Sequence, residues 1–297
     1  MANISNKAQQ MPASAIRKLV PFADAAKKEG VKVYHLNLGQ PDIKSPACAL
    51  EAIKNYSKEN ISYSHSAGLM ELRQGLVEKY YKNIGIDITV DELIVTVAGS
   101  ESVNLALEIA CDPGDEVLVL EPFYTNYNTF AFMNELTLKA IPTDIRKGFQ
   151  IPDIEEFEKA ITPKTKAILI CNPGNPTGTQ YSKESMLALG EIARKHDLFL
   201  LSDEVYREFC YTDEPHFSAM NIPGLEQNVI LIDSVSKRYN LCGARIGCIV
   251  SHNKDVMSAA MKFAQARLCS PVLGQYAAIG ALDTPESYFK EVKEEYI

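Results

Sequence analysis

The sequence predicts an α/β protein built around a large, doubly wound and mostly parallel sheet of about seven strands. Short apolar segments alternate with helical segments through the middle of the chain. Most of the short segments lack the period-2 alternation of a half-exposed sheet, which is typical of parallel strands covered on both faces. The expected strands are Leu93–Val97, Val117–Leu120, Leu136–Ile141, Lys166–Cys171, Leu198–Ser202, Val229–Ile232 and Ile246–Val250.

Helix signals occupy the segments between these strands. Apolar residues recur at helical spacing, as at Leu72, Leu76 and Tyr80, and Ser182 stands where an N-cap is expected. The turn at 112–115 contains Pro and Gly and ends the helix before it. The expected helices are Leu69–Lys82, Glu101–Cys111, Ser182–His196 and Ala277–Ile297.

Composition and charge exclude several classes of protein. Apolar residues make up 46% and charged residues 23% of the 297 residues, a composition that rules out intrinsic disorder. The net charge of −8 argues against non-specific binding to nucleic acid or to an acidic membrane, and no apolar run approaches the ~18 residues of a membrane helix. Seven cysteines without a CxxC pair, and histidines without HExxH spacing, predict free thiols in the cytoplasm and no metal site.

The segment after the expected strand Val229–Ile232 carries the strongest chemical signal. It contains Ser234, Ser236 and Lys237, and Arg245 follows nearby. Hydroxyls and a guanidinium suit a phosphate monoester, and a lysine beside a bound phosphate can form a Schiff base with an aldehyde on the same ligand. A solvated loop lysine is the alternative for Lys237 taken alone. The S-x-x-K spacing of serine acyl-transferring enzymes is also present, without the K-T-G motif that accompanies it.

Two further strand ends carry polar groups at the edge where the ligands of such sheets bind. The turn 172–178 holds two prolines and two glycines, and its rigidity either aims the Asn175 amide at a ligand or only connects a strand to a helix. Asp203 follows four apolar residues, and Tyr206 lies three residues further on. A buried carboxylate there requires a cationic or protonated partner, in a binding site or in a structural ion pair.

Two weaker signals lie earlier in the chain. Small residues around Ser100 and Glu101 precede a helix, where exposed backbone N–H groups favour phosphate. Tyr124 places an aromatic ring after the strand Val117–Leu120, which ordinary core packing also explains.

Seven motifs together carry a family resemblance. They are NLGQPD at 37–42, YSHSAGLMELR at 63–73, AGSE at 98–101, PFY at 122–124, NPGNPTG at 172–178, SDEVY at 202–206 and SVSKRYNLCGARIG at 234–247. In this order and spacing the chain resembles the class I/II aminotransferases, pyridoxal-phosphate-dependent enzymes of fold type I that are typified by aspartate aminotransferase. The resemblance implies the PLP-dependent transferase fold and pyridoxal 5'-phosphate as cofactor.

The resemblance also implies a role for each motif residue at the cofactor ring. Lys237 would hold the cofactor as a Schiff base and move the proton at the substrate's α-carbon. Asp203 would pair with the pyridine nitrogen and keep the ring an electron sink. Asn175 and Tyr206 would hydrogen-bond its phenolic oxygen, and Tyr124 would stack on the ring. Lys237, Asp203 and Tyr206 are thus the expected catalytic residues.

The remaining implied roles concern the phosphate, the substrate and the assembly. Tyr63 would reach the phosphate bound to the partner subunit, which implies a homodimer with shared active sites. Gly39 would line the substrate carboxylate site. The implied phosphate ligands are Ser234, Ser236, Arg245 and the backbone amides of Ser100 and Glu101.

The implied function is exchange of an amino group between an amino acid, aspartate or similar, and a 2-oxo acid in amino-acid metabolism. A PLP-dependent C–S lyase on the same scaffold and a non-catalytic PLP-binding protein are the alternatives. We expect residues 1–45 to form an N-terminal arm and a small-domain segment, 46–285 the large PLP-binding domain, and 286–297 the start of an interrupted C-terminal small domain. The family's arginine for the substrate α-carboxylate usually lies beyond such a point. Either the sequence is a fragment that lacks this arginine, or the substrate is bound differently, with Arg17 or Arg267 as the candidates.

Overall fold

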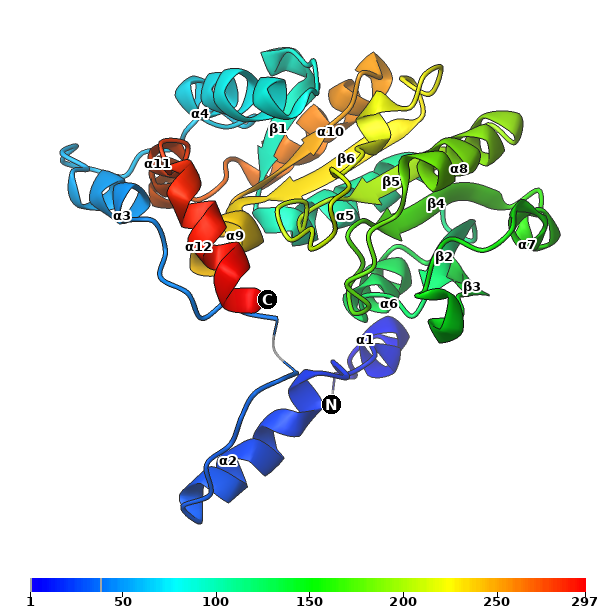
Figure 1. Ribbon diagram of the computed structural model, residues 1–297, viewed down its shortest axis with the longest axis horizontal. Helices are drawn as coiled ribbons and strands as arrows, with labels where there is room; N and C mark the ends of the chain where they lie inside the picture. The colour runs from blue at the N-terminus through cyan, green and yellow to red at the C-terminus, as the bar shows by residue number, and fades with distance from the viewer. Residues whose placement is uncertain (1, 38) are drawn as a thin grey trace.

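The computed structural model describes residues 2–37 and 39–297, so that Leu38 of the NLGQPD motif lies outside the described residues. A seven-stranded sheet with the order β1-β7-β6-β5-β4-β2-β3 forms its centre and confirms the predicted α/β class (Figure 1). The strands are β1 Leu93–Thr96, β2 Glu116–Glu121, β3 Thr137–Pro142, β4 Thr165–Cys171, β5 Phe199–Asp203, β6 Val229–Ser234 and β7 Gly247–Val250.

All strands except β7 run in one direction. The pairs β2–β3, β2–β4, β4–β5 and β5–β6 are parallel, whereas β7 is antiparallel to both of its neighbours, β6 and β1. The sheet is therefore mixed and mostly parallel. Its consequence for function is that the carboxyl ends of six strands meet at one edge.

Helices cover both faces of the sheet (Figure 1). Side chains of α5, α6 and α10 form the core on one face, and those of α4, α7, α8 and α11 contribute to the core on the other. The helices are α1 Asn6–Gln10, α2 Val20–Lys28, α3 Ala47–Lys54, α4 Met70–Gly75, α5 Ala98–Ala110, α6 Asn126–Met133, α7 Ile154–Ala160, α8 Lys183–Lys195, α9 Val235–Arg238, α10 Lys254–Arg267, α11 Val272–Ala281 and α12 Glu286–Tyr296.

Strand β4 shows why the strands read as continuous apolar runs. Ala167 and Leu169 pack on the α5 side of the sheet, and Ile168 and Ile170 on the α8 side. Since both faces are covered, neither set is polar, and the period-2 pattern disappears from the sequence. The prediction of buried strands rested on this property. It is confirmed for six strands and wrong for β3, which lies at the edge of the sheet and buries only Ile141.

Three of the expected helices differ in detail from those observed. The expected helix 69–82 is α4 followed by a π-helical segment, Leu76–Tyr81, and a 3₁₀ turn, Lys82–Ile84. The expected single helix 277–297 is wrong: α11 ends at Ala281 and α12 begins after Pro285, because proline lacks the N–H that a continuing helix needs. The helix after β1 begins at Ala98, three residues earlier than expected.

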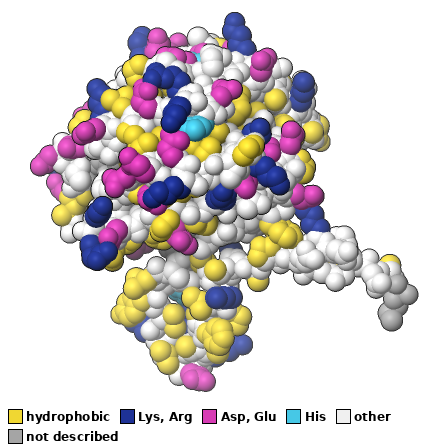
Figure 2. Space-filling view, turned by 90° about the vertical axis from the view of Figure 1, so that its right-hand side faces the viewer, with side chains coloured by type: hydrophobic (Ala, Val, Ile, Leu, Met, Phe, Trp, Pro, Cys, Tyr) yellow, Lys and Arg dark blue, Asp and Glu magenta, His cyan; other side chains and the backbone are white. Residues whose placement is uncertain are grey.

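The N-terminal residues extend away from the body of the molecule. Helix α2 lies in a projecting lobe below the sheet (Figure 1), and Figure 2 shows apolar side chains over this lobe. Phe22, Val31 and Leu36 are among the exposed apolar residues there. Within residues 2–37 and 39–297, no helix has both the length and the apolar character that crossing a membrane requires.

Candidate active site

Five segments that follow strands at the carboxyl edge of the sheet carry five of the predicted site residues. They follow β1, β2, β4, β5 and β6, and they hold Ser100, Tyr124, Asn175, Tyr206 and Lys237 respectively. These strands end at the same edge because all of them run in one direction.

The period of the strands places Asp203 and Ser234 on one face of the sheet. Leu201 and Ile232, two residues before them, both belong to the core on the α5 side. Successive residues of a strand point to opposite faces. Asp203 and Ser234 therefore continue the face on which α5 begins, and Asp233 continues the other face.

Asp203 is an acid held almost entirely away from solvent. Its exposed fraction is 6%, and the Tyr127 hydroxyl donates a 2.7 Å hydrogen bond to Oδ2. Burial raises the pKa of Asp203 to about 6, and the Tyr127 hydrogen bond opposes this rise. A cation beside this carboxylate would offset the unfavourable free energy of burying its charge. Asp203 is therefore a suitable partner for a protonated ring nitrogen.

Tyr127 is the main residue of the acid's surroundings that the sequence reasoning missed. It lies in α6, three residues after Tyr124, and its own exposed fraction is 1%. Its ring packs edge-on against Tyr124, with ring centres 5.5 Å apart, and stacks with Phe123. The spacing Tyr124-x-x-Tyr127 after a strand end was the available signal, since a turn brings residues three apart close together, and here the Tyr127 N–H donates a 3.0 Å hydrogen bond to the Tyr124 carbonyl.

Lys237 lies on α9, a helix of only four residues. Ser234 caps this helix by accepting a 3.1 Å hydrogen bond from the Ser236 N–H. The Lys237 Nζ donates to the carbonyl oxygen of Gly39 and lies 5.8 Å from the centre of the Tyr206 ring. The structure thus brings Lys237, Tyr206 and Gly39 together.

Asn175 and Tyr206 meet although they come from different strand ends. The Asn175 Nδ2 donates a 3.2 Å hydrogen bond to the Tyr206 hydroxyl. Burial raises the pKa of the Tyr206 phenol well above its ordinary value, so that it keeps its proton at neutral pH. Two groups able to donate a proton therefore lie next to each other in the site.

Hydroxyls and backbone amides form a cradle at the start of α5. The Ser234 and Ser236 hydroxyl oxygens are 2.8 Å apart, and Ser100 lies in the first turn of α5. A Cβ on Gly247 would lie 2.6 Å from the Ala98 carbonyl carbon, so that only glycine lets β7 approach the helix start this closely. Free N–H groups at the start of a 13-residue helix, with two hydroxyls beside them, suit a phosphate group.

Arg245 is exposed and has a positive φ of 56° at the turn before β7. Its guanidinium donates a 3.1 Å hydrogen bond to the Cys242 carbonyl. Arg245 directly precedes Ile246, whose carbonyl accepts a 3.0 Å hydrogen bond from the Ser234 hydroxyl. A guanidinium is a charged group of the kind that suits a phosphate.

The side chain of Glu101 does not belong to the cradle. Its carboxylate accepts from the Val97 N–H and pairs with Arg267 at 2.9 Å. Arg267 also donates to the Val95 carbonyl at 3.1 Å. The Arg267 guanidinium is therefore already paired with a carboxylate of the protein, and its role toward a substrate carboxylate stays a prediction. Arg17 is exposed.

Tyr63 lies in a loop that the body of the protein holds in place. The next residue, Ser64, accepts a 3.0 Å hydrogen bond from Gln275, and Arg267 approaches the Ser66 carbonyl at 3.5 Å. Nevertheless 79% of Tyr63 is exposed. The loop is anchored beside the Glu101–Arg267 pair, and its tyrosine faces solvent.

Comparison with known proteins gives a consistent result. Residues 31–297 match the family Aminotransferase class I and II. The chain is 32% identical over 295 residues to an aspartate aminotransferase of Thermotoga maritima, covering 98% of this chain and 78% of that one. It is 32% identical over 288 residues to an aspartate/prephenate aminotransferase of Thermus thermophilus, covering 97% and 74%.

Solved structures agree with these sequence matches. An aspartate aminotransferase from Thermus thermophilus with maleate superposes with a TM-score of 0.92 at 31% identity, over 100% of this chain and 78% of that one. An alanine aminotransferase from Pyrococcus furiosus superposes with a TM-score of 0.90 at 33% identity, over 98% and 76%.

Proposed function

Since this chain belongs to the aminotransferase class I and II family and is an aminotransferase, we propose that Lys237 binds pyridoxal 5'-phosphate as a Schiff base. We propose further that the enzyme exchanges an amino group between aspartate, or a similar amino acid, and a 2-oxo acid. The observation that carries this proposal is the convergence of Lys237, the Asn175–Tyr206 pair and the buried Asp203 at one edge of the sheet.

The side chains and backbone amides of the site suit each part of that cofactor. The buried carboxylate of Asp203 suits the ring nitrogen, and Asn175 and Tyr206 suit the phenolic oxygen. The half-buried ring of Tyr124 suits a stacking partner. The phosphate ligands we propose are Ser234, Ser236, Arg245 and the backbone amides of Ser100 and Glu101.

When bound, pyridoxal phosphate supplies an aldehyde for amines and a ring that accepts the electron pair released at the substrate's α-carbon. The residues of this chain supply the remaining chemistry. Lys237 provides the primary amine and moves the proton at the α-carbon. Asp203 holds the counter-charge in a dry environment, where it is most effective. A Cβ on residue 39 would lie 3.9 Å from the Lys237 Nζ. The glycine has no such atom and so leaves space for a substrate carboxylate beside the lysine.

The names of the relatives support aspartate as an amino-group donor, since those of Thermotoga maritima and Thermus thermophilus are both called aspartate aminotransferases. We propose a homodimer in which Tyr63 reaches the partner's phosphate site, because an anchored loop presents this tyrosine to solvent. We propose a division into an arm at 1–45, a large domain at 46–285 and a small-domain segment at 286–297. A cytoplasmic location is supported by the seven free thiols.

Borohydride reduction tests the cofactor assignment. After reconstitution with pyridoxal phosphate and reduction, peptide mapping should place the label on Lys237, and Lys237→Ala should remain colourless. Lys254→Ala, which removes an exposed lysine at the start of α10, is the control and should label as the native protein does. A label on another lysine would overturn the assignment. Formation of glutamate from aspartate and 2-oxoglutarate tests the substrate class.

A further inference from the structure

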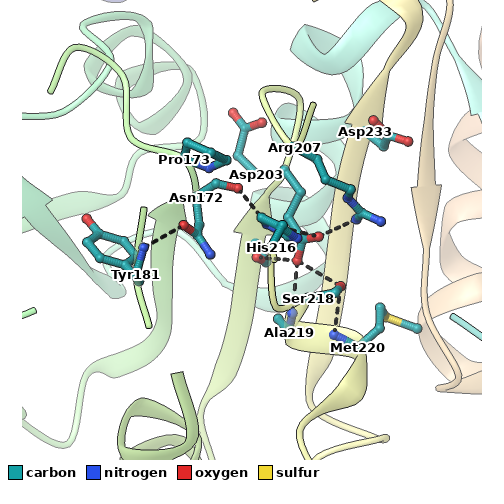
Figure 3. Close-up of polar contacts among 12 residues, drawn as sticks. Asn172, Pro173, Tyr181, Asp203, Arg207, His216, Ser218, Ala219, Met220 and Asp233 are labelled. Carbon is teal, nitrogen blue, oxygen red and sulfur yellow. Dashed lines mark hydrogen bonds and ion pairs between the residues drawn. The ribbon is translucent and has the colours of Figure 1, made fainter. Parts of the chain in front are cut away.

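Glu204 is a charged residue with no exposed surface. It follows Asp203 directly, and the alternation along the strand points it to the opposite side of the sheet. Its Oε1 accepts hydrogen bonds from the Ser202 and Ser218 hydroxyls, both at 3.0 Å, and from the Ala219 N–H at 2.9 Å. Its Oε2 pairs with Arg207 (Figure 3). Glu204 thus joins the end of β5 to the distant segment at 218–219.

His216 continues this set of contacts to the end of β4. Its Nε2 lies 3.1 Å from the Asn172 carbonyl oxygen and 3.8 Å from the Glu204 carboxylate. A carbonyl oxygen only accepts, so Nε2 carries the proton. Burial lowers the pKa of His216 below its ordinary 6.5, and the ring is neutral at pH 7. Figure 3 shows His216 between Asn172 and Ser218.

Asn172 begins the turn that carries Asn175. Its Oδ1 accepts a 3.0 Å hydrogen bond from the Tyr181 N–H, which closes the far end of that turn. The Gly174 N–H donates to the Thr179 carbonyl at 2.8 Å inside it. A restraint on the Asn172 backbone is therefore transmitted to the position of Asn175.

We propose that Glu204 is a positioning residue, which with His216 sets the separation of Asn175 and Tyr206. Asn175 follows β4 and Tyr206 follows β5. Their 3.2 Å hydrogen bond therefore requires a constant distance between the ends of these two strands. A buried carboxylate that accepts from both strand-end and loop groups supplies such a restraint, at the cost of its own desolvation. The inference rests on the proposed function, because the pair would serve the cofactor's phenolic oxygen.

Hydrogen exchange of the protein without cofactor tests the restraint directly. Glu204→Leu and His216→Phe should raise amide exchange in the turn 172–181 by about tenfold, the effect of one lost hydrogen bond of ordinary strength. Glu204→Gln keeps an acceptor oxygen and should raise the amide exchange rate of this turn by less than Glu204→Leu does. Thr165→Val removes a buried hydroxyl at the opposite end of β4 and is the matched control. Faster exchange confined to 204–219 in both variants would overturn the proposal.

A second measurement uses the loaded enzyme. Hydrogen bonds donated to the cofactor's phenolic oxygen stabilise its negative charge and so favour the deprotonated form of the bound cofactor. Loosening the Asn175–Tyr206 pair should therefore raise the midpoint of the pH titration of visible absorbance by about one unit in His216→Phe, and by less in Glu204→Gln. An unchanged midpoint in His216→Phe and Glu204→Gln, with both variants still binding pyridoxal phosphate at Lys237, would refute the positioning role and leave the proposed function standing. Failure of the native protein to bind it would refute the proposed function instead.

Discussion

Asp203→Asn tests the claim that this carboxyl is a destabilised acid before any cofactor binds. The residue is 6% exposed, and burial raises its pKa from 3.8 to about 6. Replacing it with the neutral amide keeps its volume and removes the charge. We expect the variant without cofactor to be more stable than the native protein at neutral pH.

The magnitude follows from the difference between the folded and unfolded pKa. Each pKa unit corresponds to about 1.4 kcal/mol, so that a rise from 3.8 to about 6 amounts to about 3 kcal/mol. Between these values the folded state binds more protons than the unfolded state, and the free energy of unfolding falls as pH rises. Ionisation of Asp203 therefore does not lower the free energy of unfolding at pH values well below 3.8, and it lowers it by the full ~3 kcal/mol above about pH 6.

Urea unfolding of both proteins without cofactor, from pH 4 to pH 7.5, measures this difference. The free energy of unfolding of Asp203→Asn minus that of the native protein should increase by about 2.5 kcal/mol from pH 4 to pH 7.5, with most of the increase below about pH 6. Groups common to both proteins cancel in the subtraction. A difference that does not change with pH would refute the reasoning, because it would mean that Asp203 titrates alike in both states.

Three further outcomes follow from the same contacts. Tyr127→Phe should raise the pKa of Asp203 by about one to two units, since a hydrogen bond to a charged group contributes ~1.5–3 kcal/mol, and should extend the pH window upward in the same urea experiment. Tyr63→Phe should weaken cofactor retention by ~1.5–3 kcal/mol, measured by equilibrium dialysis, whereas a monomer that retains the cofactor tightly would contradict the shared site. Arg267→Met should lower stability by about 3 kcal/mol or more, because it leaves Glu101 without its partner; unchanged thermal unfolding would show the pair to be unimportant.

The strand-end residues could be predicted from the sequence because their positions depend on local rules. Asp203, Asn175 and Lys237 each follow an apolar strand, and parallel strands bring their carboxyl ends to one edge. The order of the motifs then indicated the family, which the comparisons confirm. Helix ends were less predictable, since the break at Pro285 depends on one residue inside a long amphipathic pattern.

What the sequence by itself determined was the fold class, the family and the edge at which the chemistry lies, because strand periodicity and turn residues act over a few neighbours. Only the tertiary structure decided the partner of each buried polar group. Tyr127 reaches Asp203 across 76 positions and Arg267 reaches Glu101 across 166. Such pairs form because a charge removed from water must find a partner among the groups that packing brings near it, and packing joins segments with no relation in sequence.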